Sequence, residues 1–370
     1  NWDSGFPASR FVAPSYDVSW GNLNRPGMLD PNYGRTGYSH QWNLNIQREI
    51  FWKFVLDVGY VGNKSTGLRL GEMQRINQLP ASAMAQYGRN LNNAVRSPAD
   101  AAANGIAYPY PGFQGTVASA LRPYPQVQGN QTINVYGAPL GFSTHHALQV
   151  TANRQFSQGL TAFVNYVWSK TMTNMRSQLA NSNPNRPLDY YDLRLEKAVA
   201  EYDVPHFLKV FADYELPIGR GKAIWGNANR VTNAILGGWA VSGILNYGSG
   251  RPLRFPGSFP LAGGWNGATN RANIQSGNLT VDNYDKNAFD FRNQNAAGNT
   301  YLVKSQFSDP APLTLGSSAP FYDQARDFGV INEDIALQKN HYFNENRRLQ
   351  FRADFLNGFN RHTLGGINTT

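Results

Sequence analysis

The most regular feature of the chain is an alternation of apolar and polar residues with a period of two. In 42–47, Trp, Leu and Ile alternate with Asn, Asn and Gln. Successive side chains of a β-strand point to opposite faces, so this pattern predicts strands with one apolar and one polar face. Eight such stretches come in four pairs, at about 42–47 with 54–61, 148–153 with 160–169, 208–216 with 239–247, and 329–341 with 347–358. We therefore expect an all-β chain of antiparallel strands.

The connections between these strands fall into two lengths. The first, second and fourth pairs have short turns, around Ile50-Phe51, Ser157-Gln158-Gly159 and Asn344-Glu345-Asn346, and the third pair has a longer connection at about 218–236. Between pairs they are long loops, at about 64–142, 171–204 and 251–328. Short turns on one side and long loops on the other are typical of outer-membrane β-barrels, whose long loops face outside. The pattern predicts about eight strands of such a barrel.

Aromatic residues mark both ends of the predicted strands, in a chain with 19 Tyr, 21 Phe and 8 Trp. Trp52 and Trp239 fall at the short-turn ends. The long-loop ends carry Trp42, Tyr60, Trp168 and Tyr247. These six residues are expected to form two girdles at the two membrane interfaces. Ordinary half-buried strands of a sandwich or propeller remain the alternative, although no repeat of fixed period is present.

Composition narrows the classes of function. The formal charge is +9, but Lys and Arg are scattered singly, so we do not expect a nucleic-acid partner. The absence of cysteine excludes disulfides, thiolate metal sites and a cysteine nucleophile. Residues 1–5 (NWDSG) lack the basic start and apolar run of a signal peptide, so we expect the sequence to begin inside a longer protein.

Several motifs, in order along nearly the whole chain, resemble those of Oar-like TonB-dependent transporters. The first strand pair reads QWNLNIQRE at 41–49 and VGYVGNK at 58–64. Further matches are PYPGF at 109–113, ALRPYPQ at 120–126, YVWSK at 166–170, DVPH at 203–206, ELPIGRGK at 215–222, SGRP at 249–252 and FRADFLNGFN at 351–360. Each motif alone is weak, but their collinear order is specific.

The resemblance implies a barrel of about twenty-two strands around an N-terminal plug, energised through the TonB complex. On this basis 1–40 is expected to be an outer loop leading into the barrel, 41–358 strands and loops, and 359–370 the start of an outer loop before a missing final strand. The plug and TonB box would lie outside these 370 residues. The implied function is uptake or sensing of an external ligand by a bacterial outer-membrane protein in contact with lipid, without enzyme activity, cofactor or metal.

Two other classes of function remain open at this stage. A structural or adhesive surface protein would use the barrel to anchor binding loops, without transport. A soluble β-rich carbohydrate-binding protein would bury its apolar strand faces against a second sheet.

Candidate site residues follow from the expected faces and loops. The polar faces would line a hydrated lumen, where hydration and hydrogen bonding to a plug are favoured over substrate contact, with Asp57, Gln149, Asn153, Lys209, Asp213, Arg352 and Asp354. Loop aromatics could stack on sugars or peptides at the outer mouth, or pack the loops against themselves. These are Tyr108, Tyr110, Phe113, Tyr124, Tyr190 and Tyr191.

Other groups of polar residues have simpler interpretations. His145 and His146 precede a strand without the helical spacing of a zinc motif, so we expect satisfied hairpin histidines. Asp203 and His206 lie where a loop enters a strand, and Asp and Pro there are expected to shape the chain entry. Residues 219–222 (GRGK) lack the frame of a phosphate-binding loop, and the Asp residues of 282–290 lack the spacing of a calcium loop.

Overall fold

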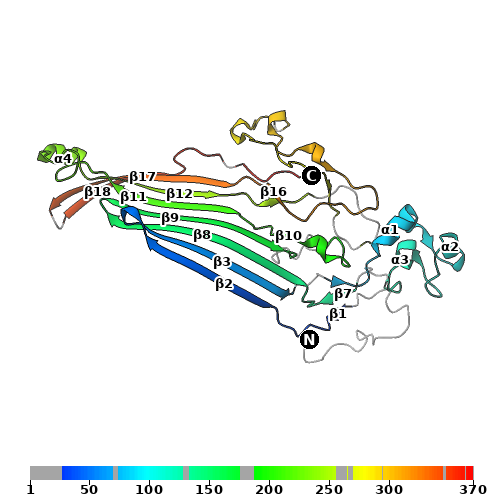
Figure 1. Cartoon of the computed structure of the whole chain (residues 1–370). Helices are drawn as coiled ribbons and strands as arrows, with labels where there is room; N and C mark the ends of the chain where they lie inside the picture. The colour runs from blue at the N-terminus through cyan, green and yellow to red at the C-terminus, as the bar shows by residue number, and fades with distance from the viewer. Residues whose placement is uncertain are drawn as a thin grey trace, which may run out of the picture.

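One large antiparallel sheet dominates the computed structural model of the chain (Figure 1). The structure describes residues 27–69, 74–127, 133–175, 187–255, 265, 270–293, 295–344, 347–362 and 364–369. The long strands of the sheet are β2 (Tyr38–Glu49), β3 (Val55–Leu68), β8 (Gly141–Ser157), β9 (Leu160–Thr173), β11 (His206–Glu215), β12 (Trp239–Gly248), β17 (Val330–Asn344) and β18 (Arg347–Phe355). All eight predicted strands are therefore present.

These strands lie in the order in which the chain forms them. Each pairs antiparallel with the next, from β2 at one edge to β18 at the other, and β10 (Ala198–Val199) adds a short pairing to β9. The sheet is open within the described residues, because β2 and β18 occupy opposite edges. The expected antiparallel, partial barrel wall is confirmed as an open curved sheet.

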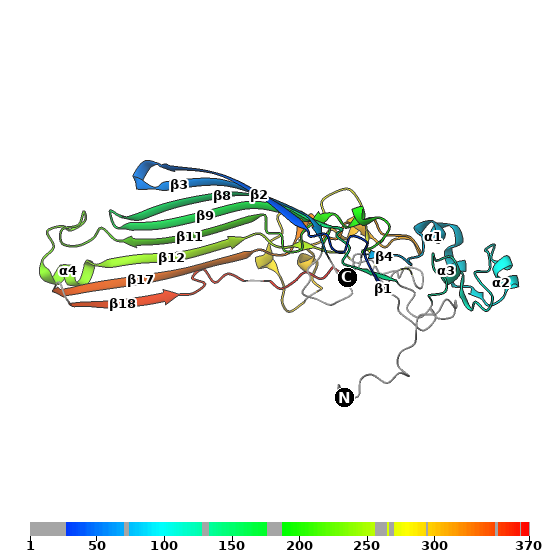
Figure 2. The ribbon, with the colours of Figure 1, turned by 90° about the horizontal axis from the view of Figure 1, so that it is seen from below.

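The short connections gather at one end of the sheet, on the left of Figures 1 and 2. Gln158 and Gly159 join β8 to β9 with φ values of 53° and 83°, as a two-residue hairpin turn requires. The 3-10 helix η4 (Phe51–Lys53) joins β2 to β3, and α4 (Arg230–Leu236) lies between β11 and β12. Residues 345–346 of the third predicted turn lie outside the described residues.

The strand register separates side chains into two faces. Paired residues share a face, so Leu44, Tyr60, Leu148, Trp168 and His206 form one row across five strands. We call the face with this row the apolar face. The opposite, polar face has the row Gln47, Asp57, Thr151, Asn165, Lys209 and Asn246. The period-two pattern of the sequence thus becomes a sheet with two chemically different surfaces.

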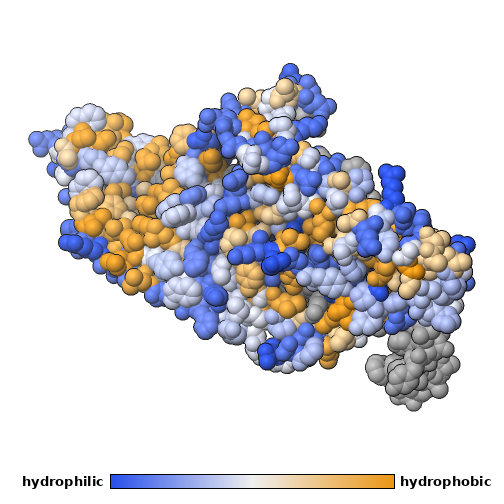
Figure 3. All heavy atoms as spheres, turned by 45° about the vertical axis from the view of Figure 1, so that its right-hand side comes forward, coloured by the Kyte–Doolittle hydropathy of each residue, from blue (hydrophilic) through white to orange (hydrophobic). Residues whose placement is uncertain are grey.

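Large side chains of the apolar face remain exposed in the described structure. Leu44 is 65% exposed, Trp168 56% and Phe351 63%. Figure 3 shows a broad apolar area at the left, over the strands. A sandwich would bury such side chains against a second sheet, so the sandwich alternative is wrong.

The long connections form a separate lobe at the other end of the sheet, which we call the loop lobe (Figure 1). It comprises β1 and the described residues within 69–140, 187–205 and 249–329. No helix of the described chain is long and apolar enough to cross a membrane. The elements of the lobe are short: β1 (Gly27–Leu29), β4 (Gln74–Arg75), α1 (Ala81–Tyr87), η5 (Gly88–Asn92), β5 (Ala94–Val95), α2 (Pro98–Ala103), β6 (Gly115–Thr116), α3 (Val117–Ala120), β7 (Asn134–Tyr136), η7 (Leu193–Glu196), β13 (Pro252–Leu253), β14 (Asn273–Ile274), η8 (Lys286–Ala288), η9 (Ala297–Asn299), η10 (Lys304–Gln306), β15 (Phe307–Ser308) and β16 (Tyr322–Arg326).

The loop lobe has hydrophobic cores of its own. One cluster contains Leu79, Leu91, Phe113 and Trp265, each at most 2% exposed, and a second is built around Phe255 and its neighbours. Trp265 comes from the third long loop and donates its indole N–H to the carbonyl of Leu188 in the second, at 2.9 Å. The three long loops therefore pack as one body.

Candidate functional site

The polar face brings together all seven residues predicted to line a lumen. The register places Asp57 and Lys209 in one row, and Asp213 and Asp354 in another through Ser242 and Ala336. Gln149, Asn153 and Arg352 have the same parity on their strands and share the face. A lumen-facing role stays a prediction, but one surface carries the whole set.

Hydrogen bonds run across the strands of this face. Gln338 donates to the Ser242 hydroxyl at 3.1 Å and accepts from the Gln350 amide at 3.0 Å. Arg352 forms an ion pair with Asp354 at 2.7 Å, with both side chains about half exposed at 52% and 51%. Arg352 and Asp354, which are bonded to each other yet half exposed, suit a hydrated surface.

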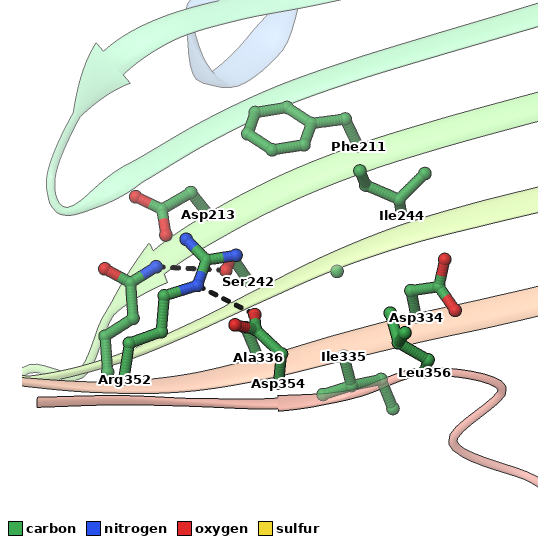
Figure 4. Close-up of a pocket in the computed structure, with 12 residues that line it drawn as sticks. Phe211, Asp213, Ser242, Ile244, Asp334, Ile335, Ala336, Arg352, Asp354 and Leu356 are labelled. Atoms are coloured by element: carbon green, nitrogen blue, oxygen red, sulfur yellow. Dashed lines mark hydrogen bonds and ion pairs between the residues drawn. The ribbon is translucent and has the colours of Figure 1, made fainter.

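A pocket of about 390 Å³ opens on the polar face toward its short-turn end (Figure 4). Its polar lining consists of Asp213, Ser242, Asp334, Gln338, Arg352 and Asp354. The Oδ1 atom of Asp213 is buried and lacks a hydrogen-bond partner among the described residues. Because a buried acceptor without a partner is costly, this oxygen is suited to accept a hydrogen bond from another group.

An apolar row interrupts the polar face beside this pocket. Phe163 pairs with Phe211, and Phe211 with Ile244, so three large apolar side chains cross β9, β11 and β12. They are 38%, 36% and 41% exposed. Alternation within a single strand did not reveal this row, because Phe163, Phe211 and Ile244 lie far apart in sequence and only the register joins them.

Five of the six predicted girdle residues lie on the apolar face. Trp42, Tyr60, Trp168 and Tyr247 lie toward its long-loop end, and Trp239 lies at its short-turn end. Trp52 lies in the turn η4, outside the sheet, and is 72% exposed. Their role at membrane interfaces stays a prediction.

Two aromatic clusters on the apolar face repeat the same contacts. In the His146 cluster, the Tyr60 hydroxyl hydrogen-bonds Nδ1 of His146 at 2.8 Å, and the Trp42 and His146 ring centroids are 6.0 Å apart. In the His206 cluster, Tyr166 bonds Nδ1 of His206 at the same distance, 2.8 Å. The Trp168 ring is parallel to that of His206 within 2°, with centroids 6.5 Å apart.

The sequence did not predict these clusters, because their members come from different strands. The one available signal was spacing: His146 precedes Leu148 and Val150 by two and four residues, which assigns it to the apolar face with them.

Most of the remaining polar candidates have structural partners. Nδ1 of His145 hydrogen-bonds the Thr171 hydroxyl at 2.8 Å, which together with the Tyr60 contact of His146 confirms satisfied histidines. Asp203 is buried, accepts the backbone N–H of Thr171 at 2.7 Å and pairs with Arg326 at 2.8 Å. Asp203 thus fixes the entry of the chain into β11.

The acidic residues at 282–290 serve local turns. Asp282 accepts from the Asn278 amide at 3.2 Å, and Asp285 accepts the backbone N–H of Asn287 at 2.9 Å. Asp290 accepts the N–H of Arg292 at 2.8 Å.

Two of the six predicted ligand-contacting aromatics are buried in the loop lobe. Phe113 is 0% exposed and packs edge-on against Tyr110 and Tyr108, with centroids 5.4 and 6.2 Å apart. Tyr190 is 6% exposed and lies beneath the Arg75 guanidinium. A surface ligand cannot touch rings that the protein covers, so for Phe113 and Tyr190 the structure favours the packing role over ligand contact. Tyr108 and Tyr110 are half-buried against the same core.

Tyr124 and Tyr191 remain exposed, at 40% and 51%. Two residues that are consecutive in sequence, Asn77 and Gln78, hold these tyrosines in place. The Asn77 side chain accepts the backbone N–H of Tyr124, and the Tyr191 hydroxyl donates to the Gln78 carbonyl at 2.9 Å. Burial lowers the pKa of nearby Arg122 to about 10, and burial also raises the pKa of the Tyr191 hydroxyl. The Arg122 side chain is itself buried, at 4% exposed, and stays charged at neutral pH near Tyr191.

Among the comparisons with known proteins, a family model agrees with a membrane wall. No curated protein matches the chain. A solved structure, the outer membrane transporter YddB from Escherichia coli, aligns over 88% of this chain and 29% of its own length, at 10% identity and a TM-score of 0.38. The chain thus spans less than a third of that transporter's length. A family model described as the outer membrane beta barrel domain matches residues 1–370. The chain belongs to this outer membrane β-barrel domain family, and its place is the bacterial outer membrane.

Proposed function

We propose that the chain forms part of the wall of a TonB-dependent transporter or receptor that takes up or senses an external ligand. The observation that carries this proposal is the polar face, which spans all the long strands and remains open to solvent. A barrel wall of this kind separates lipid on its apolar face from a hydrated interior on its polar face.

Two features of the polar face support the presence of a protein segment, such as a plug, inside the barrel. The pocket beside Asp213 has an acceptor atom without a partner among the described residues, and the row of Phe163, Phe211 and Ile244 leaves apolar area uncovered. A protein segment inside the barrel could donate a hydrogen bond to the first and cover the second. Both features are what a plug against this wall would need.

The loop lobe supports recognition at the outer mouth. Tyr124 and Tyr191 are exposed on the lobe, and rigid aromatic rings suit a ligand with apolar faces, such as a sugar or a peptide. Hydrogen bonds hold the two residues in place, from the Tyr124 backbone to Asn77 and from the Tyr191 hydroxyl to the Gln78 carbonyl.

Adhesion without transport is the second candidate function, and the size and packing of the loop lobe favour it. A lobe with two hydrophobic cores could present a fixed surface to a matrix or a neighbouring cell. Adhesion requires no movement inside the barrel. A soluble carbohydrate-binding protein is excluded by membership in an outer-membrane family.

Thiol labelling of the full-length protein in cells separates transport from adhesion. Asp213→Cys introduces the sole cysteine of the 370 residues, on the polar face, and Ala102→Cys places one on the exposed helix α2 as a control. We expect a water-soluble maleimide to label position 213 at different rates in cells with and without TonB, while position 102 labels equally. Equal rates at position 213 in both strains would contradict energised transport and favour adhesion.

A further inference from the structure

A second pocket opens on the apolar face, near its long-loop end. Its volume is about 630 Å³, and it lies between the His146 and His206 clusters with Leu148 in its lining. Residues of β16, among them Asp323 and Arg326, border it on the loop side. It therefore lies outside the proposed lumen, on the surface that faces lipid.

Aromatic rings form two sides of this pocket. Tyr60 stacks on His146 with an interplanar angle of 13°, and Trp168 stacks on His206. Trp168 is 56% exposed, so its ring is available to an occupant. In each cluster a tyrosine hydroxyl engages Nδ1 of the histidine, which leaves Nε2 as the ring nitrogen for a further partner.

Basic side chains collect at the same height on the same face. His40 pairs with Lys64, and His146 pairs with Lys170 in the next row, so basic groups occupy four adjacent strands, with His206 on the fifth. The acidic neighbour in the pocket is Asp323, which bonds Lys170 at 2.6 Å. Lys64 and Lys170 therefore share this part of the face with three imidazoles, those of His40, His146 and His206.

The ion pair in the pocket can open to an anion. Arg326 is held by Asp203 at 2.8 Å and by the backbone carbonyls of Asp203 and Gly250, so it belongs to the fold. It also pairs with Asp323, which therefore keeps one cationic partner when Lys170 turns to an anion. Lys170 and Asp323 are instead 52% and 43% exposed. Exposed pairs contribute little to stability, so a phosphate oxygen can replace Asp323 as the acceptor of Lys170.

The location of the pocket identifies its occupant. In the membrane, the lipid-facing surface at the outer interface meets the headgroups of the outer leaflet. From this location and the basic, aromatic lining we infer that the pocket binds the headgroup of a phosphorylated glycolipid. The phosphate contacts Lys170 and the imidazoles, and the sugar rings pack against Trp168 and Tyr60. The inference rests on the outer-membrane location, with the apolar face toward lipid and the long loops outside, and it is independent of transport.

Native mass spectrometry of the full-length protein in detergent micelles tests this site, with purified lipid A as the probe. We expect the wild type to retain lipid A. The double variant Trp168→Leu, Lys170→Gln should bind it about tenfold more weakly, through loss of one charge and one ring. The matched control is Trp239→Leu, Lys339→Gln, which removes the Trp and Lys in cation–π contact at the other end of the same face and should leave binding unchanged.

Two further arms identify the source of the anion. Phosphatidylglycerol, which has a phosphate but no sugar, should be retained more weakly than lipid A, and inorganic phosphate should not displace lipid A. Equal binding by the two double variants, equal retention of the two lipids, or displacement by phosphate would each overturn the assignment. Heat-modifiable migration of every variant on gels confirms that the barrel has folded.

Discussion

At the scale of single residues, the role of a side chain in this molecule depends on partners far away in sequence. Glu196 and Arg271, each 3% exposed, form an ion pair that joins the second and third long loops. Phe113 is hidden by Trp265, which lies in another loop. Local sequence does not show such contacts, which is why it left both ligand contact and loop packing open for Phe113 and Tyr190. Residues that depend only on strand parity, such as Asp213, were placed correctly on one face.

The buried pair of Glu196 and Arg271 should be essential for the loop lobe. Glu196→Gln leaves the guanidinium of Arg271 without its buried countercharge, which costs about 3–5 kcal/mol. The measurement is the urea concentration at which trypsin begins to cut the lobe, and it should fall. The control is Glu215→Gln, which breaks an exposed pair with Lys222 and should cost about 1 kcal/mol or less. If trypsin begins to cut both variants at the same urea concentration, burial of the Glu196–Arg271 pair does not add to the stability of the lobe.

Asp323 makes the stability of the loop lobe weakly dependent on pH in the acid range. Burial alone raises the pKa of Asp323, but hydrogen bonds from Lys170 and Arg326 outweigh burial and hold the pKa below its ordinary value of 3.8. A lowered carboxyl pKa stabilises the fold above the ordinary value, and this contribution is lost as pH falls through the folded-state pKa.

The Tm of Asp323→Asn should therefore lie below that of the wild type at pH 7, by a small amount because the side chain is 43% exposed. The two Tm values should converge by about pH 2–3. A difference in Tm that is the same at both pH values would contradict the ion-pair explanation.

At the scale of elements, the long strands follow from local pattern, whereas the lobe does not. Period-two alternation over ten or so residues predicts a strand wherever one face meets lipid and the other water. Helices α1, α2 and α3 contain seven, six and four residues, too few for a periodic signal. Their stability comes from the shared core around Leu79, Phe113 and Trp265, and therefore from contacts between loops.

The turn between β8 and β9 should require glycine at position 159 and accept glycine at position 158. Gly159 has φ +83°, and a Cβ there would meet the Glu215 carbonyl at 3.0 Å, so Gly159→Ala should destabilise the hairpin by about 1 kcal/mol. Gln158 also has a positive φ, 53°, so Gln158→Gly should be neutral or slightly stabilising. The folding yield of the full-length protein in detergent, read from its heat-modifiable band, compares the two. A lower yield for Gln158→Gly than for Gly159→Ala would contradict this turn geometry.

At the scale of the whole molecule, the sheet is a boundary between two environments. The apolar face, its aromatic clusters and its basic rim suit lipid and its headgroups, and the polar face suits a hydrated interior. The loop lobe closes over one end as a single packed body (Figure 2). Membership in an outer-membrane family places this two-faced sheet in the outer membrane. The transport and lipid-binding proposals both depend on the same assignment, with lipid on the apolar face and water on the polar face.

That assignment can be tested on one strand. Nitroxide labels attached to single cysteines at successive positions 207–213 of β11, in the full-length protein in lipid bilayers, report collisions with oxygen, which enriches in lipid, and with a water-soluble nickel complex. We predict that Leu208, Val210 and Ala212 collide more with oxygen and that Lys209, Phe211 and Asp213 collide more with nickel, with a period of two. Accessibility without this alternation, or with the two sets exchanged, would contradict the placement of lipid on the apolar face and water on the polar face.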